Sequence, residues 1–352
     1  MTPPDALLQL GLRERVDQEL RAFVEEEIAQ LVAIDEELEP VAAQLRVATA
    51  HGKRLRAAFC YWGWRAAGGP DSEALVRAAA SMELVHAAAV VHDDVIDSSG
   101  LRHGLPTAHR ALLRSVRRQP RAPAAARSLA VLVGDLLMAW AGQMFAHCGL
   151  PAAYLGRARP LWTVLARELV AGECLEVLRT GNPPDTAASM QVIRYKTAKY
   201  TVEHPLLIGG ALAGAALALR DAYSAYGVPL GEAFQLRDDL LGLFGDPRRT
   251  GKSTGDDLTA RRPTVLLALA WQHAGTTERG VLEGFLRRRE LTDAEVRHVR
   301  EVIRGTGAPQ RVEDMIAERV RTATAVLGRT PVPPQAARAL TELARTATAR
   351  SG

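Results

Sequence analysis

The chain is poor in aromatic residues, in cysteine and in lysine, and each shortage limits what the protein can be. Aromatic residues make up 5% of the 352 residues and apolar residues 47%, which excludes a disordered or collagen-like chain and predicts a core of small aliphatic side chains. The three cysteines, Cys60, Cys148 and Cys174, are far apart and show no disulfide or metal-ligand spacing. We expect them to be buried thiols in a reducing compartment.

Long apolar runs and a large net charge are missing too. The longest uncharged apolar run, Pro205–Leu219, has 15 residues, whereas a helix needs about 20 to cross a bilayer. The N-terminus has neither the basic start nor the unbroken apolar stretch of a signal peptide. The formal net charge of +4 is too small to indicate a nucleic acid partner. These absences predict a soluble, cytoplasmic protein without membrane insertion.

Lysine is scarce although basic residues are common. Of the 44 basic residues, only Lys53, Lys196, Lys199 and Lys252 are lysines. An ammonium group is a compact, strongly hydrated point charge that serves well as a phosphate ligand. The few positions at which an arginine-rich chain has kept lysine are therefore candidate phosphate-binding positions.

The apolar pattern predicts one helix after another. Apolar residues recur three and four positions apart, and no run alternates as a strand would. The clearest helix should begin near Pro70, with Asp71 as its cap, and run to about Gly100; it is apolar on nearly every side and should be buried. A second should cover about Pro229–Phe244 and stop at Gly245. Without a linker or composition shift, we expect a single all-α domain over residues 1–352.

Two acidic motifs lie near the ends of these two helices. The segment VVHDDVID contains Asp93, Asp94 and Asp97, and the first and last of these share a helix face. Carboxylates at a helix C-terminus oppose the helix dipole by up to about 1 kcal/mol, and Mg²⁺ is a natural counter-ion for them. The segment FQLRDDLLG repeats the pattern with Asp238 and Asp239. The two motifs could converge on one metal cluster with a phosphorylated substrate.

Basic residues accompany both motifs and suit a diphosphate. They are Lys53, Arg54 and Arg56 in HGKRLR, Arg102 in LRHG, Lys196 in YKTAKY and Lys252 in TGKSTGDD. The last segment is not a P-loop, because the GxxxxGK[ST] frame and its preceding strand are missing.

Five segments resemble, in order and spacing, the signature segments of the trans-prenyl diphosphate synthases, or polyprenyl synthetases. They are HGKRLR, LVHAAAVVHDDVIDSSGLRHGLPTAH, GDLLMAW, YKTAKY and GEAFQLRDDLLGLFGDPRRTGKSTGDDL. The resemblance covers at least Gly52–Thr264, and the flanking segments look like those of actinobacterial geranylgeranyl-type synthases. It implies an all-α, isoprenoid-synthase-type helical bundle around a central cavity, and a homodimer.

The activity that the resemblance implies is Mg²⁺-dependent condensation of isopentenyl diphosphate with an allylic diphosphate. The product would be geranylgeranyl diphosphate or a similar prenyl diphosphate. By position, Asp93 and Asp97 would coordinate two of three Mg²⁺ ions and Asp238 the third, with Asp94 and Asp239 in support.

The resemblance also assigns substrate contacts. The residues implied for isopentenyl diphosphate are Lys53, Arg56 and His86, and those implied for the allylic diphosphate are Arg102, Lys196, Gln235 and Lys252, with Arg262 where a lysine is common. Thr197 would lie near the reacting carbon, and Lys199 has no implied role.

Three further positions depart from the family pattern. His103 stands where a second arginine for isopentenyl diphosphate is usual, Ala57 replaces a usual proline, and Gly242 replaces the last aspartate of the second motif. A neutral imidazole is a poorer phosphate partner than a guanidinium. We therefore expect His103 to leave ionisation of the allylic substrate intact and to affect the affinity for isopentenyl diphosphate.

Product length should depend on the depth beneath the first acidic motif. The residues met along the helix back from Asp93 are Ala89, Ala88, Val85, Met82 and Ser81, with no aromatic plug close to the metal. In the family, a bulky residue near Ala88 or Ala89 goes with shorter products, so geranylgeranyl diphosphate or a longer product is expected. Candidates for the opposite wall are Met138, Trp140, Met144 and Trp162.

Three other functions remain open. A terpene cyclase would use the same metal cluster without a second substrate, which the intact Lys53, Arg56 and His86 oppose. A non-catalytic subunit of a heteromeric synthase would not need two intact acidic motifs. A nucleic acid binder could use the arginines between Arg110 and Arg127, but no aromatic residues are interleaved with them.

Overall fold

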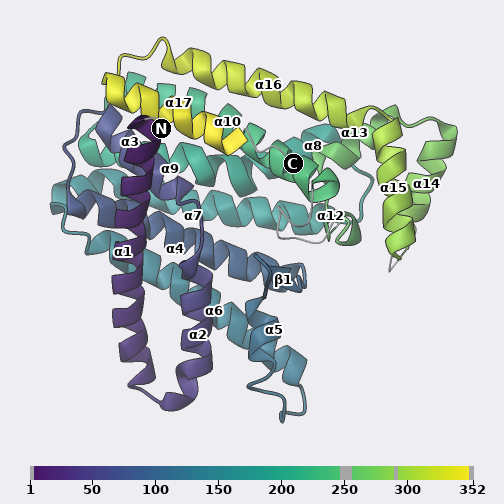
Figure 1. Cartoon of the computed structure of the whole chain (residues 1–352), viewed down its shortest axis with the longest axis horizontal. Coiled ribbons are helices and arrows are strands. Elements are labelled where there is room, and N and C mark those ends of the chain that lie inside the picture. The colour runs from purple at the N-terminus through teal and green to yellow at the C-terminus, as the bar shows by residue number, and fades with distance from the viewer. Residues whose placement is uncertain (1–3, 246–255, 289–291, 349–352) are drawn as a thin grey trace. The chain divides into compact units, whose positions relative to one another are not determined.

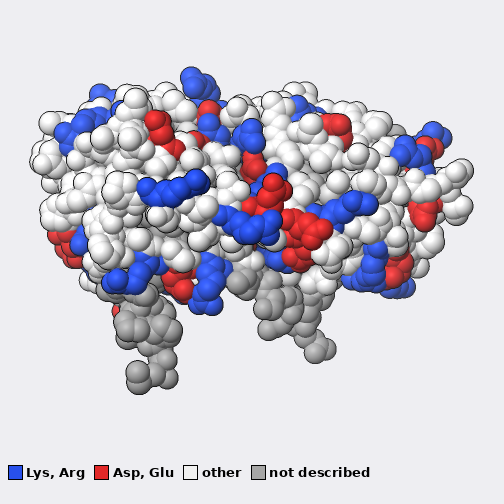
Figure 2. All heavy atoms as spheres, turned by 90° about the horizontal axis from the view of Figure 1, so that it is seen from above, with Lys and Arg blue, Asp and Glu red and all other residues white. Residues whose placement is uncertain are grey.

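A computed structural model of the chain describes residues 4–245, 256–288 and 292–348. Helices dominate these residues (Figure 1), and the strands among them form a single pair. The chain divides into two compact units: Met1–Pro160 with Pro205–Ala216 and Val332–Leu340, and Leu161–His204 with Leu217–Pro331 and Thr341–Gly352. We call these unit 1 and unit 2. Charged side chains of both signs are interspersed on the face that Figure 2 shows.

Unit 1 contains the N-terminal helices, a short hairpin and parts of three later helices. The elements are α1 (Pro4–Val32), η1 (Glu36–Leu38), α2 (Glu39–Ala50), α3 (Leu55–Ala66), α4 (Glu73–Ile96), β1 (Leu101–Arg102), β2 (Leu105–Pro106), α5 (Ala108–Leu112), α6 (Ala122–Ala146), the start of α7 (Ala152–Arg179), most of α9 (His204–Ala213) and the first part of α17 (Pro334–Thr348).

The predicted long helix is α4, and its burial is confirmed. It packs against α6, α3, α1 and α2. Its cap differs from the prediction, because the Ser72 hydroxyl, not Asp71, accepts a hydrogen bond from the Leu75 backbone N–H at 3.2 Å. Asp71 instead accepts hydrogen bonds from the Arg15 guanidinium of α1 at 3.0 and 3.1 Å. The Asp71 carboxylate therefore binds a guanidinium from another helix and does not cap α4.

Backbone contact between α3 and α9 depends on glycine. A Cβ atom at Gly63 would lie 2.4 Å from the Leu206 carbonyl oxygen, and one at Gly209 would lie 1.9 Å from the Cys60 carbonyl oxygen. Neither helix therefore tolerates a side chain at the crossing. The close packing fixes α3, which carries Arg56.

Unit 2 contains the remaining helices. They are the rest of α7, α8 (Thr186–Val192), the π-helix η2 (Ile193–Glu203), α10 (Leu217–Phe244), α12 (Asp256–Thr259), α13 (Val265–His273), α14 (Thr276–Arg287), α15 (Asp293–Gly305), α16 (Ala308–Leu327) and the end of α17. A core of aliphatic side chains joins α10, α13, α15 and α16.

The second predicted helix is longer than expected. It is α10, which ends at Phe244 before Gly245 as predicted but begins at Leu217, so that Pro229 lies inside it. Proline normally interrupts a helix. Here the neighbouring Gly227 and Gly231 pack against the η2 backbone, where a Cβ would lie 2.8 Å from Glu203 Cα and 2.5 Å from Ala198 Cα. This tertiary contact holds the helix together through the proline.

Two other expectations need correction. Cys60 and Cys148 are buried, but Cys174 is exposed, because its position on α7 faces away from the core. The sequence predicted no strand, yet Leu101 and Arg102 pair antiparallel with Pro106 and Leu105. The turn between them places His103 and Gly104 at φ 51° and 77°, as a two-residue hairpin turn with positive φ at both positions requires.

Two helices are long and apolar enough to cross a membrane. They are α4 and α6, whose most apolar windows are 72% and 44% buried. The two helices pack against each other inside unit 1. Burial in the core accounts for the apolar character of α4, whereas more than half of the α6 window is not buried.

Candidate active site

The first acidic motif occupies the last turn of α4. Asp93 and Asp97 lie on one face and are both partly exposed, and carboxylate oxygens of the two lie within 4.8 Å of each other. The helix ends between them, since Asp97 is the C-cap and its N–H donates to the Asp93 carbonyl oxygen at 2.9 Å. Two carboxylates held this close at the negative end of a helix dipole favour a bound cation.

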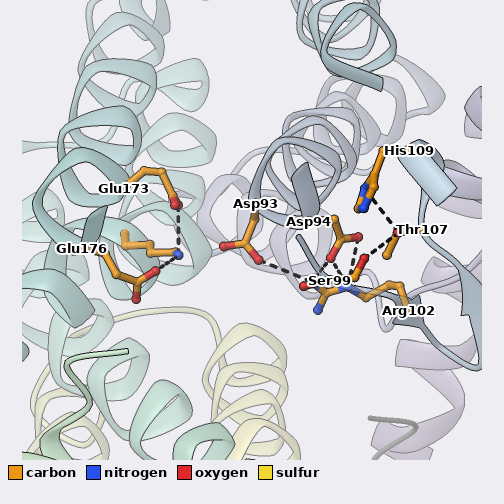
Figure 3. A network of polar contacts seen from close by, with 9 residues as sticks. Asp93, Asp94, Ser99, Arg102, Thr107, His109, Glu173 and Glu176 are labelled. Atoms are coloured by element: carbon orange, nitrogen blue, oxygen red, sulfur yellow. Dashed lines mark hydrogen bonds and ion pairs between the residues drawn. The ribbon is translucent and has the colours of Figure 1, made fainter. Parts of the chain in front are cut away.

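Asp94 points away from this pair and is almost fully buried. It forms an ion pair with Arg102, whose Nε also donates to Asp94 Oδ1 at 3.1 Å. Arg102 reaches Asp93 as well, at 3.4 Å (Figure 3). The hairpin that carries Arg102 is tied to the end of α4 by the Thr107 hydroxyl, which donates to the Ser99 carbonyl oxygen at 2.7 Å. Asp94 therefore orients Arg102, and metal coordination by Asp94 stays a prediction.

A pocket of about 80 Å³ lies beside this motif in unit 1. Five of the residues that line it are basic or imidazole side chains, namely His51, Arg54, His86, Arg102 and His103. Burial and the charges of Arg56 and Arg102 lower the pKa of His86 well below its ordinary value. His86 is therefore neutral at pH 7 and serves as a hydrogen-bonding group.

The loop before α3 is held by Arg54, a residue for which the sequence indicated no separate role. Arg54 is buried at φ 54°, and its Nε donates to Asp17 Oδ1 of α1 at 2.6 Å. Its Nη2 donates to the Thr49 carbonyl oxygen at 2.7 Å. Left-handed backbone is uncommon for arginine, so these bonds offset its cost. They fix the segment that presents Lys53, which is exposed, and Arg56, which is buried.

The departure at Ala57 has a structural reason. The Ala57 backbone N–H donates to Glu83 Oε1 of α4 at 2.9 Å, and Glu83 is buried. Proline has no N–H and could not make this bond. The alanine therefore allows Glu83 to cap the first turn of α3, where a carboxylate is favoured by the helix dipole.

The second acidic motif lies in the last turns of α10. Asp238 is partly exposed, whereas Asp239 is buried and accepts a hydrogen bond from Gln235 Nε2 at 2.8 Å. Asp239 and Arg262 line the same small cavity. The structure thus brings together Gln235, Asp239 and Arg262 as predicted members of one site, and Lys252 lies outside the described residues.

Lys196 is held by two carboxylates of α7. Its ammonium lies 3.0 Å from Glu173 Oε2 and also forms an ion pair with Glu176 (Figure 3). It belongs to η2, and π-helical segments are rare and frequently lie at functional sites. A Cβ at Gly172 would lie 2.2 Å from the Lys196 backbone nitrogen. Charge and close packing together position Lys196 and its buried neighbour Thr197.

A second lysine on η2 has the same surroundings. The Lys199 ammonium lies 3.0 Å from Glu168 Oε2 and 3.4 Å from Glu203 Oε2, and Glu168 also pairs with His204 at 2.8 Å. Burial opposes the change, but hydrogen bonds from Lys199 and His204 lower the pKa of Glu168. This cluster joins α7 to η2 and explains the lysine to which the sequence assigned no role.

Sequence reasoning missed Glu173 and Glu176. They are three positions apart on α7, hence on one helix face, and this spacing was the available signal. Their partner Lys196 is 20 or more positions away, so the pattern alone does not connect them.

The carboxylates of the first motif fit a divalent cation. Mg²⁺ binds oxygen ligands at about 2.1 Å and is commonly held by one or two carboxylates together with substrate phosphates. Asp93 and Asp97 supply such a pair without a large rearrangement. Paired aspartates at a helix end with a basic pocket beside them suit a protein that binds a divalent cation together with a phosphorylated ligand.

The family follows from comparison with known proteins. The family model described as Polyprenyl synthetase matches residues 39–303. The chain therefore belongs to the polyprenyl synthetase family, and it is a trans-prenyl diphosphate synthase with the isoprenoid synthase fold. The predicted fold class and reaction are confirmed, and the likeness is to synthases, not to terpene cyclases.

Three relatives illustrate the likeness. A geranylfarnesyl diphosphate synthase from Aeropyrum pernix is 30% identical over 294 residues, or 82% of this chain and 87% of that protein. A geranylgeranyl diphosphate synthase from Saccharolobus solfataricus is 28% identical over 265 residues, or 74% and 75%. The solved geranylgeranyl pyrophosphate synthase from Corynebacterium glutamicum, complexed with isoprenyl diphosphate and magnesium, is 34% identical with a TM-score of 0.92 and covers 97% of this chain and 99% of that one.

Proposed function

We propose that the chain condenses isopentenyl diphosphate with an allylic diphosphate to make geranylgeranyl diphosphate. The observation that carries the proposal is the paired face of Asp93 and Asp97 above a helix wall of small residues. Bound Mg²⁺ would supply positive charge to the departing diphosphate. The allylic C–O bond breaks, the double bond of isopentenyl diphosphate attacks the allylic cation, and the proton lost goes to the diphosphate.

Different side chains of this chain would bind the metal ions and the allylic diphosphate. Asp93, Asp97 and Asp238 would hold the metal ions, and Arg102 and Lys196, each fixed by carboxylates, would face the allylic diphosphate. A pre-oriented cation stabilises developing charge without reorganising during the reaction. Lys252, Gln235 and Arg262 would complete that group.

The second substrate would bind in the unit 1 pocket. Neutral His86 can accept or donate a hydrogen bond there, and Lys53 and Arg56 would supply the charge that His103 lacks when neutral. Because Arg54 anchors the loop, its removal should weaken isopentenyl diphosphate binding without touching the acidic motifs.

Product length would be set along α4. Ser81, Met82, Val85 and Ala88 are buried, and Ala89 is partly exposed. Each helical turn adds about 5.4 Å of depth. Trp140 packs against Phe23 with ring centroids 6.3 Å apart, which supports a core role over a role as cavity floor. Replacing Ala89 with phenylalanine should therefore shorten the product.

A product assay tests the proposal. The protein is incubated with Mg²⁺, farnesyl diphosphate and labelled isopentenyl diphosphate, and the products are separated by chain length. A labelled geranylgeranyl product that Asp93→Ala abolishes is expected. With geranyl diphosphate as the starter, Ala89→Phe should shift the labelled product from geranylgeranyl to farnesyl diphosphate. Conversion of farnesyl or geranylgeranyl diphosphate to unlabelled hydrocarbon would overturn it in favour of a cyclase.

Three further features follow from the family resemblance. We expect three Mg²⁺ ions, a homodimer and a cytoplasmic location. Isothermal titration with Mg²⁺ and a substrate analogue measures the first, and sedimentation equilibrium measures the second.

A further inference from the structure

The segment that joins α4 to α6 is basic throughout. From Ser98 to Gly134, between Asp97 and Asp135, the sequence contains seven arginines and no aspartate or glutamate. Six of the arginines are exposed. They are Arg110, Arg114, Arg117, Arg118, Arg121 and Arg127, and we call them the arginine segment.

Unlike several other arginines, these six have no acidic partner among the residues that the structure describes. Arg15 binds Asp71 and Glu73, and Arg46 binds Glu25 and Glu39, all within 3.0 Å. Within the described residues, none of the six arginines forms an ion pair. Their charge is therefore directed to solvent and attracts an external polyanion.

The surroundings of the arginine segment favour a lipid surface over a nucleic acid. The β1–β2 hairpin leads into α5 (Figure 1) and exposes Leu101 and Leu105, which are 55% and 43% accessible. The stretch from Ser98 to Gly134 contains no Phe, Trp or Tyr, and single-stranded nucleic acid binding relies on such rings for stacking. Arginines that closely follow exposed aliphatic side chains along the chain are a combination that suits an anionic bilayer surface.

We propose that the arginine segment docks the protein peripherally on a membrane rich in anionic phospholipid. The arginines would neutralise lipid phosphates, and the hairpin leucines would enter the headgroup region. A prenyl diphosphate product is amphiphilic, so docking would place its release near the bilayer. The docking itself does not depend on the proposed reaction, because it rests on unpaired surface charge.

Flotation with vesicles tests the docking. The full chain is mixed with vesicles of phosphatidylcholine alone or of phosphatidylcholine with phosphatidylglycerol, at low and at physiological salt. Binding should require phosphatidylglycerol and weaken with salt. The triple variant Arg114→Gln, Arg117→Gln, Arg118→Gln should bind on the order of a hundredfold more weakly, since each basic residue near an anionic surface contributes about fivefold.

A matched variant controls for net charge. Arg297→Gln, Arg311→Gln, Arg321→Gln removes three exposed charges from α15 and α16, and it should change vesicle binding by less than about threefold. Circular dichroism melting establishes that both variants are folded. Equal binding to phosphatidylcholine alone, or an equal loss in both triple variants, would overturn the proposal. So would an oligonucleotide that displaces the protein from the vesicles at physiological salt, which would indicate a nucleic acid partner.

Discussion

The end of α4 and the π-helix η2 place charge in opposite ways. At the end of α4, the Arg102 guanidinium pairs with two of the three carboxylates, mainly with Asp94 and at 3.4 Å with Asp93. On η2, the ammonium groups of Lys196 and Lys199 each lie between two carboxylates. The first region keeps a partly exposed pair of carboxylates, whereas the second holds its cations in fixed positions.

The comparison teaches how a site can bind an anion while carrying excess negative charge. Both regions contain more carboxylates than cations. A diphosphate alone would be repelled by them, but a diphosphate with Mg²⁺ brings the missing positive charge.

The largest expected effect comes from removing the carboxylate pair. Asp93→Ala should lower kcat/KM by about 10³-fold, because the charge that develops on the leaving group loses its stabilisation. Its free energy of unfolding should not fall, since a like-charge pair is relieved. Asp221→Ala, at an exposed position of α10, is the control. Activity within tenfold of the wild type in Asp93→Ala would contradict the proposed metal role.

The two lysines of η2 provide a matched test. Lys196→Met leaves two partly buried carboxylates without their cation, and Lys199→Met removes the ammonium beside the partly buried Glu168 and the buried Glu203. Each change should cost about 2 kcal/mol of stability, between the values for exposed and buried pairs. Only Lys196→Met should also lose activity, on the order of a hundredfold. Urea unfolding and steady-state kinetics measure the two effects. Equal activity losses in both variants would show that the lysines act only through the fold.

Packing behind Lys196 can be changed without touching its charge. Gly172→Ala places a methyl group against the η2 backbone and should destabilise the protein by about 1–3 kcal/mol. Gly156→Ala on the same helix meets no atom within 4 Å and should stabilise it by about 0.5–1 kcal/mol. Thermal unfolding compares them, and the same sign of effect in both would refute the close-packing explanation.

The smallest expected effect is a pH dependence of stability in unit 1. The pKa of His86 is lowered in the folded state, so below its ordinary pKa near 6.5 the unfolded chain binds the proton more readily. The free energy of unfolding should therefore decrease as the pH is lowered, and this group should account for up to about 1 kcal/mol of the decrease between pH 6.5 and 5.5. The free energy of unfolding of His86→Asn, measured at both pH values, should not show this part of the decrease. An unchanged pH dependence in that variant would assign the effect to other histidines.

Much of the site was predictable where the contacts lie within one helix. Asp93 with Asp97, and Gln235 with Asp239, are four positions apart, and the helical period alone puts each pair on one face. The pairing of Asp94 with Arg102 was not predictable, because it depends on how the chain turns after the end of α4, where Ser98 has φ 55°. Neither were Glu173 and Glu176, because their lysine is on another element.

The sequence by itself determined the helical class, the family and the positions of both acidic motifs, because these depend on composition and on spacings within single helices. The tertiary structure decided that η2 is a π-helix, that α10 continues through Pro229, and which cation each carboxylate holds. Glycines that allow backbones to touch, and side chains brought together from distant segments, have no local signature. Their arrangement is set only when the helices pack.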